Sequence, residues 1–435
     1  MHEPHPVRLV VEDDLQRSRL TVFLRLLLAI PHFIWLTLWT IAAVLAAIAN
    51  WFATLVTGRP PAALHRFLCA YIRYTVHLGA YVHLVANPYP EFFGEEGKYP
   101  VDVRLPAEPQ PQARWKTLLR IVLAIPSFAL AALLGGATGP TFNVFFFRGS
   151  SRGGARSSSG GGGAGGALTA VCAFLGWFAS LALGRMPGGL RDAGAYGTGY
   201  GAQVLAYVLL LTDRYPSTDP TALLESVEPP PPHPVHLVGE AHDLRRSRVT
   251  VFFRLPLAIP HFVWLYLWSI VIYIVVILTW FATLITGRPP RPFHRFISAY
   301  LRYQLHVFAF ASLAANPFPG FTGTPGRYPL DLVLPDEPQR QNRAKTLFRL
   351  ILAVPAWLIE VVLVYALFVA AFFTWFVALA VGEAPWGLRN LMAYALRYQS
   401  QANAYVFLIT DRYPHASPLE GEEQPRQQEL DLSLA

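Results

Sequence analysis

The chain has 435 residues, of which 53% are hydrophobic and only 14% are charged, and its formal net charge is +8. Soluble domains carry about 25% charged residues, so the long apolar blocks of this chain indicate a protein solvated by lipid. The arginines lie mostly at the ends of apolar segments, which favours anionic lipid head groups over nucleic acid as the partner. With only Cys69 and Cys172, the chain has no disulfide framework and no cysteine-based metal site to predict.

One unit recurs four times along the chain. A segment that begins with Arg and ends with Pro occurs at residues 25–31, 120–126, 254–260 and 349–355. Copies one and three are 229 residues apart (254 − 25), and so are copies two and four (349 − 120). Later landmarks keep the same order, namely a Trp-Phe pair (Trp51, Trp177, Trp280, Trp375) and a corner glycine (Gly58, Gly184, Gly287, Gly382). We interpret the chain as a tandem duplication of a half that holds two related units.

The repeats divide the chain into segments. We predict unit 1 at residues 1–110, unit 2 at 111–222, a Pro-rich linker at 223–239, unit 3 at 240–336, unit 4 at 337–415 and a disordered tail at 416–435.

Unit 1 shows the expected pattern of two helices, at about residues 20–57 and 63–86. The first begins with a short amphipathic stretch in which Arg25 is expected to reach a lipid phosphate, and Pro31 then begins or kinks the main helix. Residues 33–56 carry no charge, and at about 1.5 Å per residue they are long enough for a bilayer core of about 30 Å. Gly58 should end this helix in the left-handed conformation.

The second helix of each unit is more polar than the first. In unit 1 it carries Arg66 and Arg73, whose seven-residue spacing places both on one face. We expect that face to point at the bundle interior, a wet cavity or the head groups. Four short stretches with alternating apolar residues, at 7–11, 99–105, 235–238 and 328–334, predict strands of a small sheet outside the bilayer.

Unit 2 departs from the pattern. The Pro-to-Trp spacing is 20 residues in three units (51 − 31 in unit 1) but 51 in unit 2 (177 − 126). The additional residues include a Gly/Ser-rich insertion at about 135–166, which is typical of flexible coil. One interpretation is a degenerate copy with a disordered loop, which we favour because glycines also dilute the second helix. The other is a helix split in two at a membrane surface.

The motifs R-x5-P, W-F-x-x-L-x-T-G-R-P-P and H-R-F-x-x-A-Y-x-R-Y, together with a closing Y-P, are complete in unit 1. They resemble the bacterial membrane family known as domain of unknown function 4389. The resemblance covers most of residues 15–110 and 240–415. It implies an integral membrane protein with paired helices, and it brings neither catalytic residues nor a substrate.

The histidines suggest a metal site or proton relay only weakly. His65 and His77 are twelve residues apart, which places them about 120° apart on a helix. No H-x-x-x-H pair occurs, and the second helices of units 2 and 4 carry no histidine. We favour interfacial histidines, and we predict no metal, no cofactor and no catalytic residue.

The arginines are stronger candidates for a site. The simpler interpretation is membrane topology and contact with anionic head groups. The alternative is an anion or phospholipid head-group site between units, because Arg binds phosphate with two parallel hydrogen bonds. The candidates are Arg25, Arg66, Arg73, Arg120, Arg191, Arg254, Arg295, Arg302, Arg349, Arg389 and Arg397.

Glu360 is the only acidic residue well inside a predicted spanning helix. A carboxylate at membrane depth is a functional candidate. We favour a position near the interface or beside an arginine, and ion coupling is the alternative.

Together these patterns predict an all-α polytopic protein of the cell membrane, with about eight transmembrane helices in four parallel two-helix repeats. The basic residues before the first helices place both termini in the cytoplasm. We expect a structural component that contacts anionic lipids and protein partners of unknown identity. A transporter or channel with a path between the repeats is the alternative, and a membrane enzyme comes third.

Overall fold

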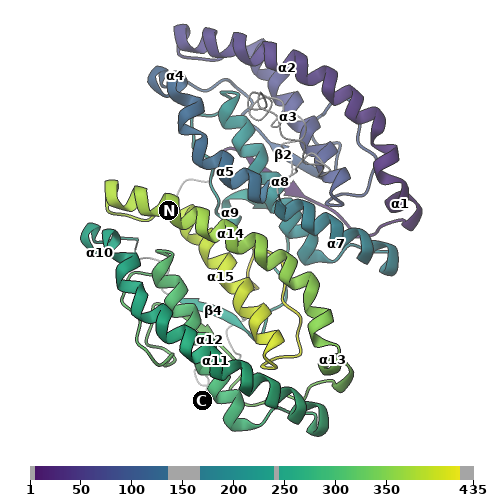
Figure 1. Ribbon diagram of the computed structural model, residues 1–435. Coiled ribbons are helices and arrows are strands. Elements are labelled where there is room, and N and C mark those ends of the chain that lie inside the picture. The colour runs from purple at the N-terminus through teal and green to yellow at the C-terminus, as the bar shows by residue number, and fades with distance from the viewer. Residues whose placement is uncertain (1–4, 136–166, 240–243, 422–435) are drawn as a thin grey trace, which may run out of the picture. The chain divides into compact units, whose positions relative to one another are not determined.

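The computed structural model describes residues 5–135, 167–239 and 244–421. Its contacts divide the chain into two compact halves, Met1–Val227 and Glu228–Ala435, and the division falls within the Pro-rich segment (Figure 1). The expected Gly/Ser-rich insertion and most of the expected tail lie outside the described residues.

The first half contains units 1 and 2. Its elements in chain order are β1 (Arg8–Val11), α1 (Arg19–Leu28), α2 (Ile30–Thr57), α3 (Ala62–Val82), β2 (Val101–Arg104), α4 (Arg114–Leu123), α5 (Ile125–Leu134), α7 (Ala167–Leu183), α8 (Gly188–Val208), α9 (Pro220–Leu223) and β3 (Leu224–Glu225).

The second half contains units 3 and 4 and repeats this order. Its elements are β4 (His236–Gly239), α10 (Arg248–Phe252), α11 (Arg254–Thr286), α12 (Arg291–Ala311), β5 (Leu330–Val333), α13 (Arg343–Leu347), α14 (Arg349–Val381) and α15 (Trp386–Val406).

The long apolar helices begin and end where the local sequence requires it. Pro31 lies in the first turn of α2, where its missing N–H costs nothing. The corner glycines Gly58, Gly287 and Gly382 adopt φ values of 79°, 78° and 86°, which a residue without Cβ tolerates. The prolines that follow these corners prevent the helices from continuing. The expected corner is therefore confirmed.

The four predicted strands are present. In the first half β1 lies between β2 and β3, antiparallel to β2 with Leu9 opposite Val103, and parallel to β3. In the second half β4 pairs with β5 in the same antiparallel register, with Leu237 opposite Leu332. These sheets lie against the second helices, since β2 contacts α3, β1 contacts α8, β5 contacts α12 and β4 contacts α15.

Each half is therefore built in three layers. The second helices form the middle layer, since α3 contacts α2 on one side and β2 on another, and α8 contacts α7 and β1 in the same way. The middle layer is enclosed most completely at α8, where every residue from 191 to 207 is buried.

Of the expected eight transmembrane helices, the structure supports only some, because the second helices are enclosed in this way. Among the described residues, three helical stretches are long and apolar enough to cross a membrane: Arg19–Thr57, Arg254–Thr286 and Arg349–Val381. The pair α4 and α5, bent by 45°, would be a fourth. The second helices α3, α8, α12 and α15 are too polar, because much of their surface contacts strands and neighbouring helices rather than lipid.

The two units of each half are joined reciprocally. The carbonyl of Gly58 at the unit 1 corner accepts a hydrogen bond from the Gln112 amide ahead of α4, at 2.9 Å, and Gly184 accepts from Arg17 ahead of α1, also at 2.9 Å. The same two contacts recur in the second half, from Gln341 to Gly287 and from Arg246 to Gly382. Each corner thus lies beside the start of the other unit.

The indoles of the Trp-Phe pairs repeat this exchange. Trp51 Nε1 donates to the Thr117 carbonyl of α4 at 2.9 Å, and Trp177 Nε1 donates to the Val22 carbonyl of α1 at 3.2 Å. Trp280 and Trp375 do the same in the second half. The two units of a half therefore run antiparallel. This corrects the expected parallel arrangement, because the chain between α3 and α4 returns along α3.

Unit 2 keeps the architecture with a split first helix. Thr169 Oγ1, in the first turn of α7, donates to the carbonyl of Leu134 at the end of α5, at 2.8 Å. Gly197 of α8 lies against this junction, and a Cβ there would meet the Leu134 oxygen at 1.9 Å and Thr169 Oγ1 at 2.2 Å. The glycine of α8 therefore makes room for the split. In the described residues the first helix of unit 2 consists of the two pieces α5 and α7, and the expected disordered loop between them lies outside those residues.

Gly197→Ala should destabilise the first half by about 3 kcal/mol, because the added methyl group overlaps a backbone oxygen that packing holds in place. Thermal unfolding in detergent, followed by circular dichroism, measures the loss. Gly320→Ala is the matched control, since a Cβ at Gly320 meets nothing within 4 Å, and it should change stability by less than about 0.5 kcal/mol. Equal effects of the two substitutions would contradict this account of α8.

Candidate lipid interface

The outer face of the long helices is an exposed apolar stripe. On α11 the exposed residues include Ile259, Tyr266 and Tyr273, which repeat every seven positions, whereas His261 and Leu265 are buried on the inner face. The same spacing recurs on α2 with Leu38, Leu45 and Phe52, and α14 carries a matching series. We refer to these outward-facing residues of the long helices as the apolar face. Nothing in the described part of either half covers it.

Exposed arginines lie at the two ends of the apolar face. Arg66 and Arg295, two of the candidates, are exposed near the starts of α3 and α12, close to the exposed corner residues Arg59 and Arg288. At the opposite end of the first half Arg19 is exposed and donates to the Ala182 carbonyl at 3.1 Å. These cationic groups flank the apolar face, as the head-group interpretation requires.

Four other candidates lie inside the protein. Arg25, Arg120, Arg254 and Arg349 each have only 1–2% of their surface exposed. Their guanidinium groups point at the end of the second helix in their own unit. This corrects the expectation that Arg25 reaches out to phosphate, because the last carbonyls of a helix lack partners and attract a cation.

Arg25 shows how this arginine clamp is built. Its guanidinium donates to the carbonyls of Tyr81 and Ala86, the latter at 2.9 Å, and to Asn87 Oδ1 at 3.1 Å. It also stacks over the ring of Tyr81 with its central carbon 4.4 Å from the ring centroid. The start of the first helix is thereby tied to the end of the second.

The other three units repeat the clamp. Arg120, Arg254 and Arg349 stack over Tyr207, Phe310 and Tyr405 at 4.2, 4.2 and 4.6 Å. Units 2 and 4 add a carboxylate, since Arg120 lies 3.1 Å from Asp213 and Arg349 lies 2.7 Å from Asp411. The sequence showed the repeating arginine, but only the structure shows that its partner is a helix end.

The remaining candidates are engaged within their own units. Arg73 forms ion pairs with Glu96 at 3.0 Å and Asp102 at 3.3 Å. The others have partners as follows: Arg191 with Asp192 at 2.7 Å, Arg302 with the Leu332 carbonyl at 3.0 Å, Arg389 with Asn390 at 3.3 Å and Arg397 with Glu420 at 3.1 Å. The structure therefore does not gather the arginines into a shared anion site.

Two buried His–Asp pairs connect the second helices to the strands. His77 Nε2 lies 3.0 Å from Asp102 Oδ1, and His306 Nε2 lies 2.8 Å from Asp331 Oδ1. Burial raises the pKa of each aspartate, but hydrogen bonds from the histidine and from backbone N–H groups lower it by more. The pKa of each aspartate therefore lies below its ordinary value. Sequence reasoning missed these pairs, although the 25-residue His-to-Asp spacing in units 1 and 3 is a visible signal.

No group of three or more His, Cys, Asp or Glu residues within the described ranges is placed to hold a metal ion. His65, one of the histidines considered, bonds the Pro106 carbonyl through Nε2 at 2.8 Å. Glu360 is half-buried on α14 and hydrogen-bonds Gln399 of α15 rather than an arginine.

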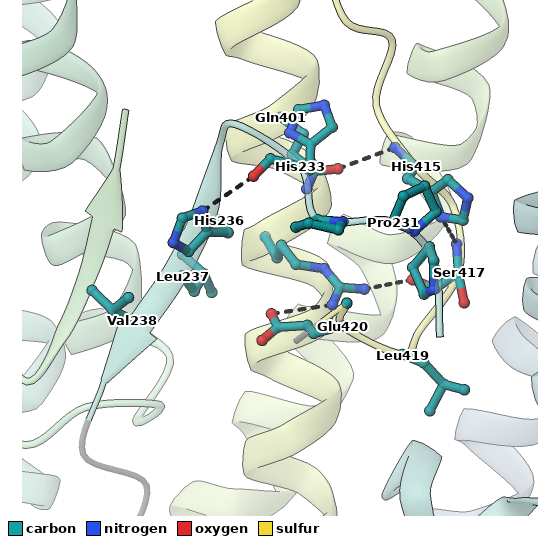
Figure 2. A pocket seen from close by; sticks show the side chains of 14 residues that line it. Pro231, His233, His236, Leu237, Val238, Gln401, His415, Ser417, Leu419 and Glu420 are labelled. Carbon is teal, nitrogen blue, oxygen red and sulfur yellow. Dashed lines mark hydrogen bonds and ion pairs between the residues drawn. The ribbon is translucent and has the colours of Figure 1, made fainter. Parts of the chain in front are cut away.

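A cavity of about 250 Å³ in the second half is lined by the Pro-rich segment, β4, α15 and the segment that follows α15 (Figure 2). Its polar groups bond one another. Gln401 donates to the Val235 carbonyl at 2.9 Å and accepts from the His415 amide at 3.1 Å, while Arg397 pairs with Glu420. Ligand pockets are usually larger, at about 300–1,000 Å³, so this polar cluster is better described as the attachment of the strand segment to α15.

A histidine anchors the strand segment in each half. Val7 N donates to His5 Nδ1 at 3.1 Å, and Val235 N donates to His233 Nδ1 at 3.1 Å. Both rings are buried, and burial is the largest cause that lowers the pKa of each to about 4. Protonation of Nδ1 would also remove the acceptor of the backbone hydrogen bond. These two histidines were not among the candidates.

The family model described as Domain of unknown function (DUF4389) matches residues 19–94, 163–218, 248–322 and 343–417. The chain belongs to this family. Each match falls on one of the four units, and each DUF4389 repeat includes the second helix with its clamped end. No curated protein and no solved structure matches the chain.

Arg25→Met should destabilise the first half by about 3 kcal/mol, because it leaves buried helix-end carbonyls without a donor. Arg25→Lys should lose less, since an ammonium group still donates to some of them. Unfolding in detergent measures both. Arg66→Met is the control, because Arg66 is exposed, and its effect should stay within about 0.5 kcal/mol. A stable Arg25→Met protein would show that the clamp is dispensable.

Acid should weaken the strand attachment through His5 and His233. Their folded-state pKa of about 4 lies below the ordinary histidine value of 6.5, so the unfolded chain takes up the proton first. The two neutral histidines therefore contribute fully to stability above pH 6.5, and their contribution falls as pH decreases toward 4. His5→Asn with His233→Asn keeps a side-chain acceptor that does not titrate. Melting temperatures from pH 7.5 to 4.5 should therefore fall less in the double variant than in the parent.

Proposed function

We propose that this DUF4389 protein is a structural component of the cell membrane whose apolar face is solvated by acyl chains and whose exposed arginines contact anionic head groups. The observation that carries the proposal is the apolar face itself. It follows the whole length of the long helices, whereas soluble monomers rarely expose apolar patches larger than a few hundred Å².

The charges at the ends of the apolar face support the same partner. Arg66, Arg295, Arg59 and Arg288 are exposed beside the corners, where a helix leaves the apolar layer. Each Lys or Arg near an anionic membrane surface contributes about 1 kcal/mol of attraction. A lipid partner accounts for both the apolar residues and the charges that flank them.

A transport path receives less support from the described residues. Glu360 suggested such a path, and its carboxyl group bonds Gln399 between α14 and α15. Apart from the exposed Arg66 and Arg295, the candidate arginines are also held within separate units. The cytoplasmic location of the termini and the existence of a protein partner stay predictions.

Replacing Arg66 and Arg295 together with Gln should weaken binding to anionic vesicles by roughly thirtyfold, which corresponds to about 2 kcal/mol for two charges. Co-flotation with phosphatidylcholine vesicles, with and without phosphatidylglycerol, measures the partition coefficient. Binding to the neutral vesicles should change little, because the apolar face is intact.

The matched control is Lys98→Gln with Arg104→Gln, which removes two exposed charges from the strand side of the first half. This pair should leave the preference for anionic vesicles close to that of the parent. An equal loss in both double variants would show that net charge alone decides binding, and absence of flotation in the parent would overturn the proposed function.

A further inference from the structure

The strand layer runs along the middle helix of unit 1 rather than beyond its end. Three residues of α3 contact the strand layer. His65 lies 2.8 Å from the Pro106 carbonyl, and Asp102 lies 3.3 Å from Arg73 and 3.0 Å from His77. The twelve residues from His65 to His77 correspond to about 18 Å of helix, which is more than half of the roughly 31 Å length of α3. An upright α3 would therefore carry this extended segment to membrane depth.

That segment is charged and open to solvent. Arg104 on β2 pairs with Glu225 at 3.0 Å while 58% of its side chain stays exposed, and Lys98 pairs with Glu95 in the loop before it. A bilayer core tolerates neither exposed sheet edges nor unburied charge. In the second half, Arg302 and His306 hold β5 to α12 in the same way, so the argument applies to both halves.

The apolar face is also too long for an upright orientation. On α14 it extends from Leu350, 63% exposed, to Val381, 65% exposed. The 31 steps between these two residues cover roughly 47 Å, whereas the hydrocarbon core is about 30 Å thick. On α11 the distance from Leu255 to Ile285 is similar, about 45 Å.

Tyrosines occupy the middle of the face. Tyr365 is the central residue of α14 and is 61% exposed, and Tyr273 near the middle of α11 is 64% exposed. If the helices stood upright, these hydroxyl groups would lie near the bilayer centre. Tyr is enriched at membrane–water interfaces, where its ring is apolar and its hydroxyl meets water.

We infer that each half lies flat in one leaflet, with the apolar face toward the acyl chains and the strands toward water, and that the long helices do not cross the bilayer. This inference rests on the proposed function for its lipid partner and adds the orientation. It places both ends of every long helix at the head groups of the same leaflet, where the exposed arginines of both ends bind anionic lipid.

Depth measurements test the orientation directly. Spin labels are attached at Leu350→Cys, Tyr365→Cys and Val381→Cys in a full chain that carries Cys69→Ala and Cys172→Ala, reconstituted into phosphatidylcholine–phosphatidylglycerol vesicles. Accessibility to oxygen and to a water-soluble nickel chelate gives the depth of each label. All three should lie at the shallow depth of about 5–10 Å that is typical of in-plane helices.

Other depth profiles have distinct meanings. A label at Tyr365 near the bilayer centre, at about 15 Å, with both end labels at the head groups, would overturn the flat orientation but leave the lipid-contacting function intact. Labels that contact water, or that are immobilised by a second copy of the chain, would overturn the proposed function as well.

Sidedness provides a second measurement in the first half. Arg59→Cys and Arg185→Cys mark corners at opposite ends of the half, and Arg104→Cys marks the strand layer. In the same cysteine-free background and in sealed vesicles of uniform orientation, a membrane-impermeant maleimide should label all three from one side. Labelling of Arg59→Cys and Arg185→Cys from opposite sides would contradict the flat orientation.

Discussion

The arginine clamp is the interaction on which the DUF4389 unit depends. A polar second helix ends with carbonyl groups that have no intrahelical partner, and burial would make those groups costly. Arg25 and its three counterparts supply the donors from the first helix and stack on the aromatic side chain of the penultimate residue of the second helix. The same contact fixes the angle between an apolar helix and a polar one. A lipid-facing layer and a strand-facing layer can therefore belong to one rigid unit.

The clamp acts within a unit, while the corner acts between units. Gly58 and Gly184 each present a carbonyl to the other unit, and Trp51 and Trp177 exchange indole hydrogen bonds in the same sense. These reciprocal hydrogen bonds can form only when both units are present, so the half is the smallest complete structure. It also explains how unit 2 tolerates a split first helix. Its corner, clamp and Trp contact are intact, and Gly197 absorbs the change locally.

The sequence was informative where a residue type has one structural use. Glycine at the corner, alternation in the strands and the repeat of the units were all readable, and the structure has each of them. It was misleading where one residue type has two uses. An arginine near an apolar helix can contact a phosphate or a buried carbonyl. Unit 1 contains one buried arginine, Arg25, and one exposed arginine, Arg66. The position of the hydrogen-bond partner decides whether such an arginine is buried, and the partner of Arg25 lies 56 residues away in the sequence.

The length of an apolar helix does not by itself decide whether the helix crosses the membrane. An uncharged run of two dozen residues satisfies the length of a bilayer core, but the run does not specify its angle to the membrane. The neighbouring layer specifies that angle. Because α3 is bound along its length to a charged strand, α2 cannot turn upright without carrying Asp102 and Arg104 into the acyl chains. In the orientation that we propose, the polar layer thus determines how the apolar layer meets lipid, and contacts such as His77 with Asp102 influence membrane geometry without touching a lipid molecule.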